Sequence, residues 1–167
     1  MSEQCFSMEK VIEVTNISKT FSGRKVLDNV SISVQRGSIC GLVGRNGCGK
    51  TVLMKCICGF LPVTTGTIRV FGKEIGRDVD FPESLGVIIE TPGFLTQYTG
   101  VKKLEILADM KRMISKADIR LILKKVGLDP DMKKPVGKYS LGMRQRLGIA
   151  QAIMEDPRFL ILDEPFN

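Results

Sequence analysis

One stretch of eight residues, from Gly44 to Thr51, constrains the fold of this chain more than any other feature. It reads Gly-Arg-Asn-Gly-Cys-Gly-Lys-Thr and matches the spacing G-x-x-x-x-G-K-[ST] in full. An apolar run, 39–43, precedes it, and a segment of helical composition, 50–58, follows it and stops at Gly59. The order of buried strand, glycine-rich loop and helix predicts a phosphate-binding loop in an α/β fold.

The chemistry of this loop follows from its residue types. Glycines let backbone N–H groups point at phosphates, and the start of a helix adds the positive end of its dipole. Lys50 is expected to reach the β- and γ-phosphates, and the Thr51 hydroxyl to bind Mg²⁺. The alternative is a chance glycine-rich turn, which the strand–loop–helix context disfavours. The residues expected to contact the nucleotide are Gly44, Asn46, Gly47, Cys48, Gly49, Lys50, Thr51 and Val52.

A second site is indicated where the apolar run 159–162 ends in Asp163 and Glu164. Carboxylates at the carboxyl end of a strand are placed to act on a nucleotide held by a neighbouring loop. Asp163 is expected to bind the metal directly or through water, and Glu164 to act as general base toward the attacking water. Alone, such a pair could be a solvated strand end, but together with the loop it favours a hydrolytic site.

The remaining pattern places further elements around these sites. Residues 11–14 and 30–34 alternate apolar and polar types on either side of Ser22-Gly23, which predicts an antiparallel layer. Strands are also expected at 67–71 and 85–89. Residues 101–127 and 142–154 carry apolar residues at helical spacing, which predicts a helical insert and then another helix.

Composition excludes several classes of protein. No apolar run approaches the roughly 20 residues of a membrane-spanning helix, and 1–10 lacks the apolar core of a secretory signal. We therefore expect a cytosolic chain. The net charge of +7 includes the pairs Lys124-Lys125 and Lys133-Lys134, but with no Trp and only 6% aromatic residues no nucleic-acid partner is expected. Without any histidine, the cysteines are expected to be small buried hydrophobes rather than metal ligands.

The segment from Tyr139 to Arg146, just before the carboxylate strand, resembles the signature L-S-G-G-Q of the nucleotide-binding domains of ATP-binding cassette (ABC) transporters. Ser140 and Gly142 coincide with the signature, whereas Leu141 and Met143 depart from it. The resemblance implies that two such domains sandwich ATP and Mg²⁺, with Ser140 and Gly142 facing the γ-phosphate held by the second domain. A plainer interpretation makes Ser140 the N-cap of a helix, and both roles can hold.

Two further residues take their expected roles from this resemblance. Phe21 stands where the family keeps an aromatic residue that stacks on adenine, although an aromatic near a strand is more often core. Glu90 stands where the family usually has a glutamine that contacts Mg²⁺ and the attacking water. A glutamate here is similar to transporters that give self-protection against bacitracin and lantibiotic peptides; the alternative is a tolerated substitution.

The resemblance implies a P-loop NTPase (RecA-like) α/β core with an N-terminal antiparallel β layer, an inserted helical subdomain and an incomplete sheet. Residues 1–167 are expected to form one truncated ATP-binding domain, divided into 1–90, 91–141 and 142–167. The family continues beyond Asp163-Glu164-Pro165 with a central strand and a switch histidine, so we expect a fragment or a truncated gene product.

The expected function is an ATP-binding and ATP-hydrolysing subunit, peripheral on the inner face of the plasma membrane, that energises a transmembrane permease. Export of peptide antibiotics or similar compounds is the expected task. Two alternatives are a nucleotide-binding fragment that does not hydrolyse ATP and a soluble ABC-type protein acting on ribosomes or nucleic acid.

Overall fold

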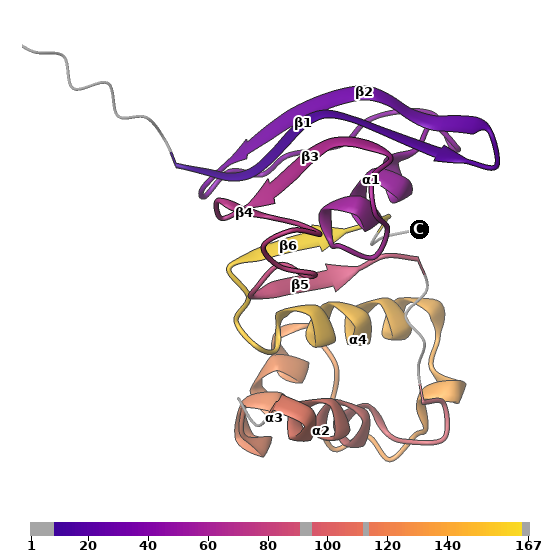
Figure 1. Ribbon diagram of the computed structural model, residues 1–167. Coiled ribbons are helices and arrows are strands. Elements are labelled where there is room, and N and C mark those ends of the chain that lie inside the picture. Colours follow the sequence, from indigo (N-terminus) through magenta and orange to yellow (C-terminus); the bar gives the residue numbers. More distant parts are fainter. Residues whose placement is uncertain (1–8, 91–94, 112–113, 165–167) are drawn as a thin grey trace, which may run out of the picture. The chain divides into compact units, whose positions relative to one another are not determined.

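The computed structural model describes residues 9–90, 95–111 and 114–164. The chain divides into two compact units, Met1–Glu83 and Ser84–Asn167 (Figure 1). The three regions expected from the sequence, 1–90, 91–141 and 142–167, are defined by their functions and not by their internal contacts. This division of the chain stays a prediction. None of the described helices is both long and apolar enough to cross a membrane.

The first unit is built on an antiparallel sheet with the strand order β2-β1-β3-β4. A turn at Ser22-Gly23, where both residues have positive φ, joins the first two strands. The predicted antiparallel layer is confirmed, whereas the two-residue β4 is too short to leave a pattern in the sequence. The strands are β1 (Lys10–Phe21), β2 (Arg24–Gln35), β3 (Thr65–Val70) and β4 (Lys73–Glu74).

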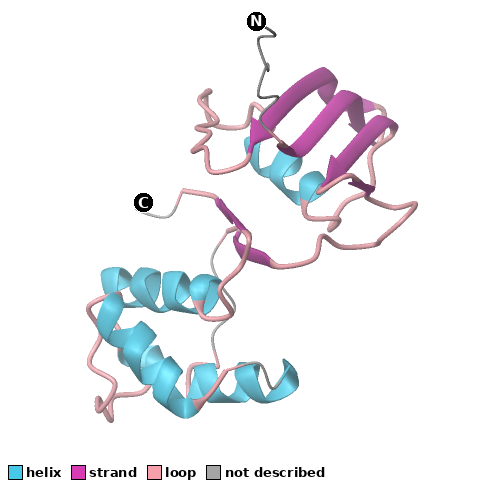
Figure 2. Cartoon of the chain, turned by 90° about the vertical axis from the view of Figure 1, so that its left-hand side faces the viewer, coloured by secondary structure: helices cyan, strands magenta, loops and turns pink. Residues whose placement is uncertain are grey.

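Helix α1 (Lys50–Ile57) lies along one face of this sheet (Figure 2). Its apolar side is buried through Leu53, Met54, Cys56 and Ile57, and the helix contacts β3, whose Ile68 is buried. The predicted helix is confirmed to within one residue, since Cys58 is the C-cap and Gly59, at φ 79°, turns the chain away.

The expected buried strand at 39–43 is wrong. The segment has no regular secondary structure, and the Ile39 and Val43 side chains are fully exposed. An apolar run becomes a buried strand only where neighbouring strands satisfy its backbone and other elements cover its side chains. Neither sheet among the described residues contains 39–43.

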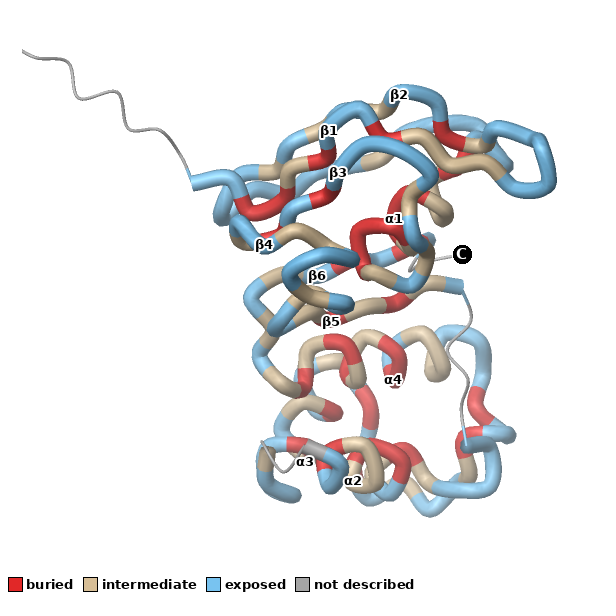
Figure 3. Tube along the Cα trace, viewed as in Figure 1, coloured by how far each residue is buried: buried red, intermediate tan, exposed pale blue. Residues whose placement is uncertain are grey.

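The second unit joins a two-stranded parallel sheet to a group of helices. Strands β5 (Leu85–Ile88) and β6 (Phe159–Leu162) pair in parallel, and α4 (Leu141–Ile153) contacts β5. Helices α2 (Gly100–Lys111) and α3 (Lys116–Lys125) form the predicted helical insert, followed by the 3₁₀ turn η1 (Val136–Lys138). Figure 3 marks the buried positions, which include Leu104, Ile119, Leu123, Val136, Leu147 and Ala150.

Candidate functional site

The loop that precedes α1 depends on a glycine at its last position. Gly49 is the N-cap of α1 and has φ 98°, a conformation that side chains disfavour. A Cβ there would lie 2.9 Å from Leu27 Cδ2 and 3.1 Å from the Val26 carbonyl oxygen. Because glycine has no side chain, the N-cap residue itself makes no side-chain hydrogen bond to the start of α1.

The Lys50 side chain turns back into the loop. Its Nζ donates to the carbonyl oxygens of Gly44 at 2.8 Å and Arg45 at 3.2 Å. The Cys48 N–H also donates to the Arg45 carbonyl at 3.2 Å, so the loop closes around the ammonium group. Cys48 Sγ lies over Gly44, where a Cβ would come within 2.6 Å of the sulfur. The structure thus holds the Lys50 ammonium against carbonyl oxygens of the loop, whereas a bound phosphate would contact the ammonium and backbone N–H groups.

Residues 44–48 of this loop are exposed, while Gly49 is buried and Lys50, Thr51 and Val52 are partly buried. The loop is therefore open to a ligand at its outer part and anchored to the unit at its helical end. A helix start with glycine at its N-cap and a lysine beside it fits an anionic phosphate. Contact of the predicted residues with a nucleotide stays a prediction.

Phe21 lies at the end of β1, next to the hairpin turn. Its ring is 40% exposed, and Lys19 Nζ lies 5.0 Å from the ring centroid. The ring is therefore a surface feature rather than part of the core. An exposed ring can stack on a base, but the adenine contact stays a prediction.

The acidic residues after β5 and β6 are brought to one edge of the parallel sheet. Ile88 pairs with Leu162, so Glu90 and Glu164 occupy equivalent positions beyond the two strand ends. Asp163 N donates to the Ile88 carbonyl at 2.7 Å, which extends the pairing past β6. The ends of β5 and β6 therefore bring Glu90, Asp163 and Glu164 to the same edge of the sheet. Carboxylates at this edge can act on a bound ligand.

The three carboxylates differ in environment. Asp163 is buried, at 9% exposure, whereas Glu90 and Glu164 are exposed. Both glutamates have positive φ, 60° and 44° respectively, which is uncommon for residues other than glycine. Such backbone strain is often found at functional sites.

A bound Mg²⁺ would need oxygen ligands from more than the protein. Among the described residues, no three Asp, Glu, Cys or His side chains converge on a metal site. The hydroxyl of Thr51 and the carboxylates of Asp163 and Glu90 are hard oxygen donors of the type Mg²⁺ prefers, with phosphate oxygens completing its shell. Thr51 belongs to the first unit and the carboxylates to the second, so their meeting at one ion stays a prediction.

Ser140 caps helix α4. Its Oγ accepts a hydrogen bond from Met143 N at 3.2 Å, which bears out the capping interpretation. Gly142 is exposed, and a Cβ there would meet no atom within 4 Å. The start of α4 is therefore open to an external group, and the γ-phosphate contact of Ser140 and Gly142 stays a prediction.

Sequence reasoning missed the residue that holds this helix start in place. The Tyr139 carbonyl accepts from Arg144 Nη1 at 2.8 Å, and its buried hydroxyl accepts from Gly100 N at 3.3 Å. Tyr139 thereby ties the chain before Ser140 to the start of α2. The only signal in the sequence is an aromatic residue directly before the signature-like segment.

Comparison with known proteins assigns these features to one family. A family model described as ABC transporter matches residues 27–167. The chain is 44% identical to the uncharacterized ABC transporter ATP-binding protein YybJ of Bacillus subtilis (strain 168), over 94% of this chain and 72% of YybJ. It is 45% identical to the bacitracin transport ATP-binding protein BcrA of Enterococcus faecalis, over 96% of this chain and 52% of BcrA.

A lantibiotic transport ATP-binding protein, SrtF of Streptococcus pyogenes, is 36% identical over 94% of this chain and 67% of SrtF. Among solved structures, an ATP-binding subunit of an ABC transporter superposes with a TM-score of 0.79 at 28% identity, over 93% of this chain and 67% of that chain. The chain thus spans about half the length of BcrA and about two thirds of the other proteins.

Proposed function

The chain belongs to the ABC transporter family, and on this premise we propose that it binds Mg·ATP through the loop 44–51. The observation that carries the proposal is the loop itself. Its carbonyl groups hold the Lys50 ammonium, and the start of α1, with glycine at its N-cap, directs the positive end of the helix dipole toward the loop. Phe21, exposed at the end of β1, supplies a ring for the adenine base.

ATP hydrolysis is the reaction we propose for the complete protein. When bound, Mg²⁺ offsets the charge of the phosphates, with Thr51, Asp163 and Glu90 as its protein ligands. Glu164 accepts the proton of the attacking water as that water adds to the γ-phosphorus and the bond to the β-phosphate oxygen breaks. Glu90 lies at the equivalent position on the neighbouring strand, where it helps to orient the same water.

Two such domains are proposed to share the nucleotide. Ser140 and Gly142, at the positive end of α4, then contact the γ-phosphate held by the loop of the second domain. The open space at Gly142 supports this arrangement, because a phosphate group needs close approach to the backbone.

A transmembrane permease is the proposed membrane partner, which places the chain at the inner face of the plasma membrane. The similarity to proteins named for bacitracin and lantibiotic transport supports export of peptide antibiotics as the task. The glutamate at position 90 supports the same assignment.

Nucleotide binding is tested by Lys50→Ala with Lys55→Ala as matched control, since Lys55 lies in the last turn of the same helix. Loss of a charge-assisted contact should weaken Mg·ATP binding by about 1.5–3 kcal/mol, measured by titration calorimetry. The control variant should bind like the parent. Equal affinity of parent and Lys50→Ala would remove Lys50 from the phosphate site.

A further inference from the structure

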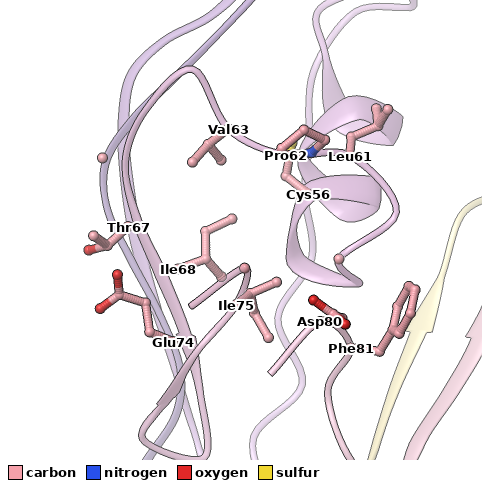
Figure 4. A pocket seen from close by; sticks show the side chains of 13 residues that line it. Cys56, Leu61, Pro62, Val63, Thr67, Ile68, Glu74, Ile75, Asp80 and Phe81 are labelled. Carbon is pink, nitrogen blue, oxygen red and sulfur yellow. The ribbon is translucent and has the colours of Figure 1, made fainter. Parts of the chain in front are cut away.

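The first unit has a solvent-open cavity of about 470 Å³, and none of its lining residues belongs to the loop 44–51. The end of α1, the segment after it, β3 and the residues around β4 form its walls (Figure 4). The volume falls within the range of about 300–1,000 Å³ of small-molecule sites. All lining residues lie in one unit, so the cavity is independent of how the two units are arranged.

The two ends of the cavity differ in charge. Asp80 and Phe81 lie together at one end, and Cys56, Leu61 and Pro62 lie at the other (Figure 4). Asp80 is exposed, and its carboxylate takes part in none of the ion pairs between described residues. A Cβ at Gly59 would collide with the Asp80 carbonyl, so the backbone of Asp80 is packed tightly against the end of α1.

Glu74, the other carboxylate of the cavity, is already neutralised. Its Oε2 lies 3.1 Å from Arg69 Nη2 and 3.8 Å from Arg77 Nη1. Opposite Asp80, Lys19 Nζ donates to the Pro62 carbonyl at 2.5 Å and places a positive charge at that end. The uncompensated negative charge of the cavity is therefore that of Asp80.

Aromatic rings border the acidic end. Phe60 and Phe81 are 49% and 58% exposed, and their ring centroids lie 6.2 Å apart at an interplanar angle of 59°. Between the two ends the cavity is lined by Ile68 and Ile75 (Figure 4). A carboxylate and a nearby aromatic face both stabilise a bound cation, whereas the aliphatic walls favour an apolar group.

We propose that this cavity binds an organic cation with an apolar body. The cationic group lies beside Asp80 and Phe81, and the apolar part extends toward Ile68. This site goes beyond the proposed function, because none of the residues assigned to nucleotide binding lines it.

The experiment uses three probes of matched size, namely hexylamine, 1-hexanol and hexanoate, titrated into the full chain at pH 7. Binding is measured by calorimetry and by saturation-transfer NMR. The proposal expects hexylammonium to bind most tightly and hexanoate most weakly. Asp80→Asn should weaken hexylammonium binding by about fivefold, as for an exposed charge pair, and leave 1-hexanol binding unchanged.

Glu83→Gln is the matched control, because Glu83 is an exposed acidic residue that pairs with Lys73 and does not line the cavity. A second variant, Ile75→Phe, fills the cavity and should abolish binding of hexylammonium and 1-hexanol, with an unchanged far-ultraviolet circular dichroism spectrum. The proposal is overturned if the three probes bind alike or not at all, if Glu83→Gln acts like Asp80→Asn, or if Ile75→Phe leaves binding intact.

Discussion

At the scale of single residues, the cysteines divide into two environments that the sequence did not distinguish. Cys56 and Cys58 are buried as expected, and burial raises the pKa of both thiols, that of Cys58 to about 12. Cys40 and Cys48 are exposed, which contradicts the expectation of buried hydrophobes. Cys5 lies outside the described residues.

This difference predicts how the thiols react with iodoacetamide at pH 8. Since the thiolate is the reactive form, Cys56 and Cys58 should stay unmodified while Cys40 and Cys48 react. Mg·ATP should slow the modification of Cys48, which lies over Gly44 in the phosphate loop, by about fivefold or more, as expected for a ligand near saturation.

Cys40 serves as the internal control of that experiment, because it is exposed but precedes the loop. Peptide mass spectrometry gives the rate at each cysteine from one digest. Equal protection of Cys40 and Cys48, or none at Cys48, would contradict a nucleotide bound at the loop.

Glu164 and Glu90 occupy equivalent positions but are assigned different roles. Glu164→Gln should lower any ATP hydrolysis by about 10²–10⁴-fold, because the general base is lost, and should leave ATP binding intact. Glu90→Gln should retain more activity, because an amide oxygen can still contact Mg²⁺ and water. Phosphate-release and binding assays on both variants measure the difference, and a larger loss for Glu90→Gln would exchange the two roles.

At the scale of elements, a buried lysine joins two helices of the second unit. Lys103 of α2 is 2% exposed, and its Nζ donates to Gln151 Oε1 of α4 at 2.5 Å. Burial disfavours the charged form and lowers the pKa of Lys103 from 10.5 to about 8. Where the lysine is charged, its burial therefore lowers the free energy of unfolding by about 3 kcal/mol.

The sign of the pH dependence follows from this depressed pKa. Below pH 8 the lysine is charged in both the folded and the unfolded states, and the folded state bears the full cost of burying the charge. Between pH 8 and about 10.4 the unfolded state binds more protons, so the free energy of unfolding rises with pH. In urea denaturation, the free energy of unfolding of Lys103→Met should not show this part of the rise with pH. The control is Lys102→Met, at an exposed lysine paired with Glu105, and its free energy of unfolding should still rise. If the free energies of unfolding of Lys103→Met and of the parent rise in parallel with pH, Lys103 is not the source of the pH dependence.

Elements with a clear local pattern of apolar and polar residues could be predicted, strands as well as helices. Helices α1, α3 and α4 carry apolar residues at helical spacing, and α3 starts with a capping box at Ser115 and Asp118. The run 39–43 has the composition of a buried strand, but composition does not supply the strands that must lie beside it.

The same distinction applies to the candidate site. The loop 44–51 could be found because its residues are contiguous and its spacing is specific. The alignment of Glu90 with Glu164 depends on the parallel register of β5 and β6, which are distant in sequence. Their positive φ angles also depend on tertiary structure, and so does the tether at Tyr139, for which the sequence offers only an aromatic residue before the signature-like segment.

At the scale of the whole molecule, the exposed segment 39–43 bears on how the chain behaves in solution. Ile39 and Val43 are fully exposed within a contiguous apolar run, whereas Leu121, 61% exposed on α3, has the charged residues Asp118, Lys124 and Lys125 one helical turn away. Contiguous exposed apolar surface promotes association, but single exposed apolar residues are ordinary. We therefore expect the chain to self-associate through 39–43 as its concentration rises.

Replacing Ile39 by threonine tests this expectation, because the change keeps a β-branched side chain and lies outside the phosphate loop. If association buries the isoleucine, Ile39→Thr should weaken self-association by about tenfold, a loss of roughly 1.4 kcal/mol that is close to the worth of one buried aliphatic side chain. Leu121→Thr should change it less. Sedimentation over a range of concentrations measures the effect, and Mg·ATP affinity should stay the same in both variants. An equal effect of the two substitutions would show that general hydrophobicity, and not the segment 39–43, drives the association.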